Sequence, residues 1–187
     1  MPDTPLHALN AAGQSIWLDY IDRTMLHDGT LERRIADDAL TGMTSNPTIF
    51  EKALAEGHAY DEQLATVAEG RKAWDVFELV AAHDVRRACD VFRPVYDRTN
   101  GTDGFVSLEV SPNVANDAAG TVAEARRLWA DVDRPNVMIK VPGTPAGAEA
   151  LRTLIAVDRR VQELWSVGAR SEAVARRALA NVEKRSR

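Results

Sequence analysis

The sequence predicts an α/β fold in which strand–helix units repeat around a parallel sheet. Short apolar runs typical of strands alternate with longer stretches in which apolar residues recur every three or four positions. The short runs end near Pro, Gly, Ser or Asn, residues that commonly mark strand ends. This alternation predicts parallel strands joined by helices.

Four strands are expected from the apolar runs, at residues 16–20, 40–44, 105–110 and 137–141. A fifth strand at 157–164 is poorly supported, because that stretch carries too much charge for a strand buried on both faces.

Three helical regions follow from the spacing of the other apolar residues. The longest lies between the second and third strands, and further helices are expected at 123–130 and 146–156. The last of these has Thr144 as a plausible N-cap and Pro145 at its first position. The apolar residues of the longest region are interpreted as core rather than as a cofactor-binding set: Trp74, Phe77, Ala81, Val85, Ala88 and Phe92.

The composition is that of a soluble globular protein with one domain: 187 residues, 45% hydrophobic and 27% charged. Neither a membrane span nor a secretory signal is expected, so the cytoplasm is the predicted compartment. The net charge of −5 argues against nucleic acid as the main partner. The single cysteine, Cys89, lies among apolar residues at helical spacing and is expected to be a buried core thiol.

Each predicted strand ends in polar residues of catalytic type. In a strand–helix barrel, the active site is assembled from the carboxyl ends of the strands. The residues at or near those ends are Asp19, Thr44-Ser45-Asn46, Glu109 and Lys140.

Lys140 is the candidate nucleophile among them. It stands in an apolar strand, and if its amine points inward, loss of solvation favours the neutral form that attacks carbonyl carbon. Asp19 and Glu109 could then move protons. Two simpler interpretations stay open: a lysine at a strand end that reaches solvent, and a structural ion pair with a carboxylate.

Metal, nucleotide and dinucleotide sites are not supported by the motifs. The sequence has no glycine-rich phosphate loop, no dinucleotide fingerprint and no paired cysteines. The four histidines are scattered without metal-ligand spacing.

Two segments carry a resemblance to a known family. Residues 42–50, Gly-Met-Thr-Ser-Asn-Pro-Thr-Ile-Phe, and residues 137–144, Val-Met-Ile-Lys-Val-Pro-Gly-Thr, resemble the Thr-(Thr/Ser)-Asn-Pro and lysine segments of transaldolases. Residues 15–19 and 106–111 are similar to the family's first and third strands, in the family's order. The resemblance covers roughly residues 10–156 and is closest to the amino-terminal portion of bacterial transaldolases.

The resemblance implies a (β/α)8 TIM barrel and a metal-free, cofactor-free transfer of a dihydroxyacetone unit between sugar phosphates in the pentose phosphate pathway. It implies Lys140 as the Schiff-base residue, Asp19 as the base that starts carbon–carbon cleavage, and Glu109 as a proton shuttle acting through a water. Asn46 and Thr44, with Ser107 behind them, are implied to orient substrate hydroxyls and the lysine.

The chain departs from the family after residue 156. A full barrel needs about 250 residues, so residues 1–156 are expected to form four or five strand–helix units. Residues 157–187 are interpreted as a divergent, basic helical tail. In the nearest match to the family's next strand, residues 160–166, Arg160 and Gln162 replace the expected Asn and Thr.

The truncated barrel leaves three hypotheses open. The first is a transaldolase whose activity is weak or depends on completing the barrel. The second is a non-catalytic half barrel that self-associates through its open strand edges. The third is a related Schiff-base aldolase of the fructose-6-phosphate type, which uses the same lysine but releases a free product.

Overall fold

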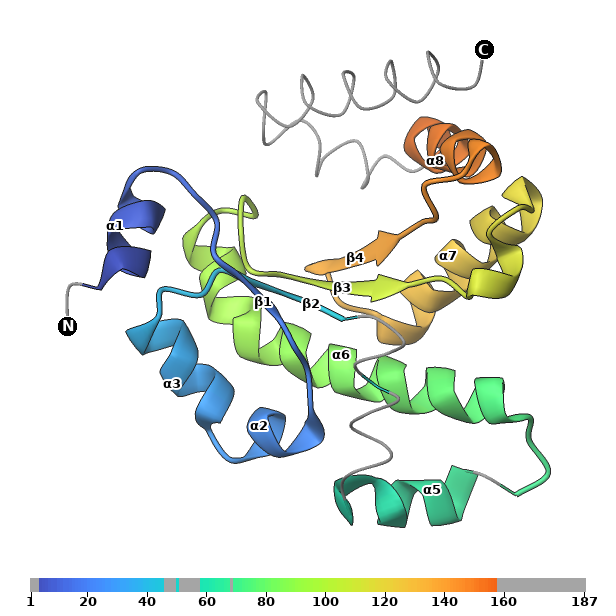
Figure 1. The fold of residues 1–187 in the computed structure, drawn as a ribbon, viewed down its shortest axis with the longest axis horizontal. Helices are drawn as coiled ribbons and strands as arrows, with labels where there is room; N and C mark the ends of the chain where they lie inside the picture. The colour runs from blue at the N-terminus through green and yellow to red at the C-terminus, as the bar shows by residue number, and fades with distance from the viewer. Residues whose placement is uncertain (1–3, 46–49, 51–57, 68, 158–187) are drawn as a thin grey trace. The chain divides into compact units, whose positions relative to one another are not determined.

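The structure is a computed structural model that describes residues 4–45, 50, 58–67 and 69–157 (Figure 1). It divides into two compact units. The first comprises Met1–Glu109 with Asp131–Met138, and the second comprises Val110–Ala130 with Ile139–Arg187. The predicted tail at 157–187 lies outside the described residues except for Val157, the last residue of a helix.

All four predicted strands are present, and each is slightly shorter than expected. They are β1 (Trp17–Asp19), β2 (Gly42–Thr44), β3 (Phe105–Glu109) and β4 (Val137–Lys140), and the sheet order follows the chain, β1-β2-β3-β4. The pairs β1–β2 and β2–β3 are parallel. The predicted α/β class is therefore confirmed.

The predicted helices are also present, with wider bounds. They are α6 (Ala73–Arg98), α7 (Ala118–Val132) and α8 (Pro145–Val157). At α8 the predicted cap is confirmed, since the Gly147 N–H donates to Thr144 Oγ1 at 3.0 Å and Pro145 is the first helical residue.

Several short elements were not predicted from the sequence. They are too short to show a clear apolar period: α1 (Pro5–Ala11), α2 (Arg23–His27), α3 (Thr30–Asp37), α5 (Asp61–Val67) and the 3₁₀ turns η1 (His58–Tyr60) and η2 (Pro112–Val114). Three have readable caps, because the side chains of Thr4, Asp22 and Ser111 accept from backbone N–H groups of α1, α2 and η2.

The core of the first unit lies where α6 packs against β3 (Figure 1). Val80, Val85, Ala88, Cys89 and Phe92 of α6 are fully buried, as are Met43 of β2 and Val106 of β3. The core interpretation of α6 therefore holds for its central and carboxyl-terminal turns. Trp74 and Phe77 are only half-buried and stack on each other, with ring centroids 4.9 Å apart.

One glycine fixes the entry into β3. Gly104 has a φ of +85°, and a Cβ there would lie 2.3 Å from the backbone nitrogen of Tyr96 in α6. Its own N–H donates to the Thr41 carbonyl at 2.7 Å, just before β2. A larger residue at 104 would separate β3 from the helix that covers it.

Candidate active site

The carboxyl ends of β1 and β2 and the middle of β3 bring three of the predicted site residues into one row. Backbone register pairs Asp19 with Thr44, and Thr44 with Ser107. Because side chains alternate between the two faces of a strand, residues paired in this way share one face of the sheet. The row formed by Asp19, Thr44 and Ser107 belongs to the first unit.

Hydrogen bonds tie the β2 and β3 side of this row together. The Ser107 hydroxyl donates to Thr44 Oγ1 at 2.9 Å, and the Ser45 hydroxyl donates to the Ser107 carbonyl at 2.7 Å. Ser107 and Ser45 are 3% and 1% exposed, whereas Asp19 is exposed and Thr44 is half-buried. Ser45 thus holds the β3 backbone and Ser107 holds the Thr44 side chain, and the accessible groups of the row stand on β1 and β2.

Trp17 and Gly42 lie one layer below the row, on the same face. They are paired in register, and a Cβ on Gly42 would come within 2.4 Å of the Trp17 indole. The indole therefore lies directly over the glycine backbone. Glycine at 42 is required by this close approach and not by its backbone angles.

Glu109 ends β3, two residues beyond Ser107, and so continues the same face. It is half-buried. Asn46, the remaining residue expected to orient substrate, lies outside the residues that the structure describes.

Lys140 ends β4 as predicted and belongs to the second unit. It is half-buried, and its carbonyl accepts from the Val110 N–H at 3.2 Å. The burial of β4 decreases along the strand, from a buried Val137 to half-buried residues at 138–140. The structure therefore places the lysine at the predicted strand end.

A buried charge cluster in the first unit was not found from the sequence. Asp84 of α6 is fully buried, and its Oδ1 accepts from Arg23 Nε at 2.9 Å and Nη2 at 2.7 Å. The guanidinium carbon of Arg23 lies 4.3 Å from the centroid of the Tyr60 ring. Burial, together with the nearby Asp84 carboxylate, raises the pKa of the Tyr60 hydroxyl.

This cluster joins α2, η1 and α6, and we assign it a structural role. Its members are separated by 37 and 61 positions in sequence, so no local pattern could have predicted their meeting. Ser45 differs from these residues, because it lies inside the motif of residues 42–50 and directly after a predicted strand. That position could be read from the sequence as a sign of a site residue.

Neither a metal site nor a membrane span was found in the described part of the chain. In the described ranges, no group of three His, Cys, Asp or Glu side chains could hold a metal ion. Similarly, none of the helices described here is long and apolar enough to cross a membrane.

Comparison with known proteins identifies the family. The family model described as transaldolase/fructose-6-phosphate aldolase matches residues 16–162, which include all four strands. The chain belongs to this family. The four strands and their helices are thus part of a TIM barrel, and the chain matches the amino-terminal portion of the family as predicted.

Individual transaldolases of the family match over most of the chain. That of Thermobifida fusca is 52% identical over 154 residues, which are 82% of this chain and 42% of the relative. That of Thiobacillus denitrificans is 47% identical over 167 residues, 87% of this chain and 46% of the relative. That of Mycolicibacterium paratuberculosis is 44% identical over 182 residues, 96% and 48% respectively. The chain therefore spans less than half the length of each of these relatives.

Proposed function

We propose that the chain carries the Schiff-base lysine and the proton-transfer groups of a transaldolase-type reaction. In that reaction a dihydroxyacetone unit passes from a ketose phosphate to an aldose phosphate. The observation that carries the proposal is the family match over residues 16–162, within which Lys140, Asp19 and Glu109 all fall.

Covalent catalysis begins at Lys140. Its neutral amine attacks the ketose carbonyl carbon, and loss of one water leaves a protonated imine. Asp19 takes the proton from the hydroxyl beside the bond that breaks. The bonding electrons move into the imine to give an enamine, and the first aldose phosphate leaves as an aldehyde.

The second half of the reaction reverses these steps on an acceptor. The enamine carbon attacks the acceptor aldehyde, Asp19 returns its proton to the new hydroxyl, and water hydrolyses the imine. Glu109 moves protons through a water as the imine forms and hydrolyses. Thr44 and Asn46 orient substrate hydroxyls, and the Ser107 hydroxyl, which donates to Thr44, holds that threonine in place.

The substrates proposed are sedoheptulose 7-phosphate or fructose 6-phosphate as donor, with glyceraldehyde 3-phosphate or erythrose 4-phosphate as acceptor. This places the reaction in the pentose phosphate pathway of the cytoplasm. The alternative within the family is a fructose-6-phosphate aldolase, which the family description also names. Both reactions use the same lysine, and they differ in whether the enamine is passed to an acceptor aldehyde or protonated.

Borohydride trapping tests the assignment of Lys140. The protein is incubated with fructose 6-phosphate and borohydride, which reduces the imine to a stable secondary amine, and its peptides are examined by mass spectrometry. We expect the added mass on the peptide that contains Lys140.

Two variants control this experiment. Lys140→Ala should abolish the adduct, whereas Lys72→Ala, which removes an exposed lysine at the start of α6, should leave it unchanged. An adduct on other lysines but not on Lys140 would contradict the proposal. Adding erythrose 4-phosphate to the untrapped reaction then separates transferase from aldolase, since only the former forms a new ketose phosphate.

A further inference from the structure

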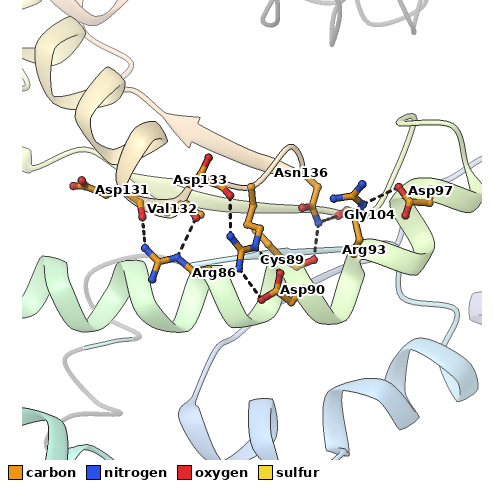
Figure 2. Close-up of polar contacts among 11 residues, drawn as sticks. Arg86, Cys89, Asp90, Arg93, Asp97, Gly104, Asp131, Val132, Asp133 and Asn136 are labelled. Atoms are coloured by element: carbon orange, nitrogen blue, oxygen red, sulfur yellow. Dashed lines mark hydrogen bonds and ion pairs between the residues drawn. The ribbon is translucent and has the colours of Figure 1, made fainter.

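Asn136, the residue directly before β4, has a fully buried side chain in the first unit. Its Nδ2 donates to the Cys89 carbonyl of α6 at 2.9 Å and to the Gly104 carbonyl before β3 at 2.8 Å (Figure 2). One amide therefore connects the start of β4 to the helix that covers the sheet and to the turn that leads into the neighbouring strand.

Only a donor can occupy this position, because both partners are backbone carbonyls. The Oδ1 atom of Asn136 is buried and has no hydrogen-bond partner among the described residues. Burying an amide oxygen in this way costs free energy unless another interaction offsets it. Two N–H···O bonds of ordinary length to backbone carbonyls supply that offset, so the donors of the asparagine side chain are the groups that act here.

The backbone of Asn136 sets the pairing of β4 with β3. Its carbonyl accepts from the Val106 N–H at 3.0 Å, and four residues further on the Lys140 carbonyl accepts from the Val110 N–H at 3.2 Å. In both bonds the residue number of the acceptor exceeds that of the donor by 30. The register of β4 on β3 is therefore the same at both ends of the strand. A slip by one residue would turn each β4 side chain to the opposite face of the sheet.

Neighbouring contacts hold the turn before β4 but do not reach β3. Arg134 pairs with Asp90 of α6 on the surface, with Nε 2.5 Å from Oδ1. Arg86 Nε donates to the Val132 carbonyl at 3.1 Å (Figure 2). Asp133, with a φ of 49°, ends α7 in the left-handed conformation typical of helix ends. Of these residues, Asn136 is the one that hydrogen-bonds to both α6 and β3 within the described part of the chain.

We propose that Asn136 is a positioning residue: its buried amide fixes the register of β4 on β3 and, through it, the side of β4 from which the Lys140 side chain projects. The catalytic meaning of this role rests on the function proposed above for Lys140. The effect of Asn136 on the register rests only on its own contacts and on the two backbone hydrogen bonds between β4 and the segment 106–110.

Amide hydrogen exchange tests the register by itself. The full chain is compared with Asn136→Ala and with Arg134→Gln, a matched control that removes the surface ion pair two residues away. We expect the control to keep the Val106 and Val110 amides protected and Asn136→Ala to lose protection at both. Full protection of Val110 in Asn136→Ala would overturn the proposal. If that variant does not fold, Asn136→Ser, which keeps one donor, is measured in its place.

Chemical labelling then tests the effect on the lysine. Borohydride trapping with fructose 6-phosphate is compared with acetylation of Lys140 by a water-soluble ester, on variants that are fully folded by circular dichroism. We expect trapping to fall by roughly 100-fold in Asn136→Ala, as for a reacting group displaced by about 1 Å, while acetylation stays within about threefold.

Equal trapping in Asn136→Ala and Arg134→Gln would overturn the positioning role. If Lys140 of the unaltered chain is not trapped at all, the proposed function fails, and amide exchange at Val106 and Val110 still decides whether Asn136 sets the register.

Discussion

Thr44 and Ser107 show how a shared register acts at the scale of single residues. They lie 63 positions apart in the chain, yet their hydroxyls are 2.9 Å apart because β2 and β3 are parallel and their register pairs Thr44 with Ser107. The strand ends place Asp19 in the same row through the pairing of β1 with β2. A row of polar groups at strand carboxyl ends is the arrangement from which barrel active sites are built.

Cys89 provides a prediction at the residue scale. Its thiol is fully buried, and desolvation raises its pKa to about 12, with the neighbouring Asp90 carboxylate acting in the same direction. Since the thiolate is the reactive form, we expect almost no reaction of the folded chain with iodoacetamide at pH 8, and fast reaction in urea. If the folded chain were labelled as fast as the unfolded chain, the Cys89 thiol would not be buried as described.

The same thiol also contributes to the pH dependence of stability. Its folded pKa lies above the ordinary thiol value of 9.0, so the folded state binds the proton more tightly than the unfolded state. This contribution is therefore fully present below pH 9 and is lost as the pH rises towards 12. Cys89→Ser would remove that part of the alkaline loss of stability.

At the scale of elements, the Arg23–Asp84 ion pair connects α2 to α6. Its side chains are 12% and 0% exposed, so it is a buried pair in which either partner alone would be an uncompensated charge. The ring of Tyr60 covers the guanidinium, and its hydroxyl accepts from the Arg23 N–H at 3.1 Å. The cluster thus holds the start of α2 against η1 and α6.

We predict that Asp84→Asn lowers the free energy of unfolding by about 3–5 kcal/mol, because it leaves Arg23 buried without its counter-charge. Urea denaturation followed by circular dichroism measures this loss. The matched control is Arg34→Gln, which breaks the more accessible Arg34–Asp38 pair, with side chains 43% and 34% exposed, and should cost no more than about 0.5 kcal/mol. If both variants lost the same free energy of unfolding, burial of the Arg23–Asp84 pair would add nothing to its effect on stability.

At the scale of the whole molecule, the chain spans 46% of the Thiobacillus denitrificans transaldolase, and β1 lies at one end of the described strand order. An outer strand presents backbone N–H and C=O groups that can pair with another chain. Trp17 of β1 and Tyr20 just beyond it are 36% and 47% exposed. In the described strand order β1 therefore has a hydrogen-bonded neighbour on one side, β2, and its end carries these two exposed aromatic side chains.

We predict that the 187-residue polypeptide self-associates through β1. Size-exclusion chromatography with light scattering at micromolar concentration should give multiples of 20.5 kDa. Trp17→Lys, which adds a charge to the outer strand, should reduce the association, whereas Leu79→Lys at an exposed position of α6 should not. A monodisperse species of 20.5 kDa would contradict this prediction.

The sequence by itself determined the α/β class, the four strands, the three longer helices and the position of Lys140 at the end of β4. These features depend on the spacing of apolar residues, on the residues that end strands and on the caps of helices. All three can be read from residues that are close together in the sequence. The motifs of residues 42–50 and 137–144 also indicated the family, which the comparison over residues 16–162 confirmed.

Only the tertiary structure decided which distant groups meet. The Ser107–Thr44 bond, the Arg23–Asp84 pair and the contacts of Asn136 join residues 32 to 63 positions apart. An asparagine before a strand has the same local pattern whether its amide faces water or two buried carbonyls. Its role depends on the packing of α6 and on the register of β3, and both are set by contacts between distant segments and not by neighbours in the chain.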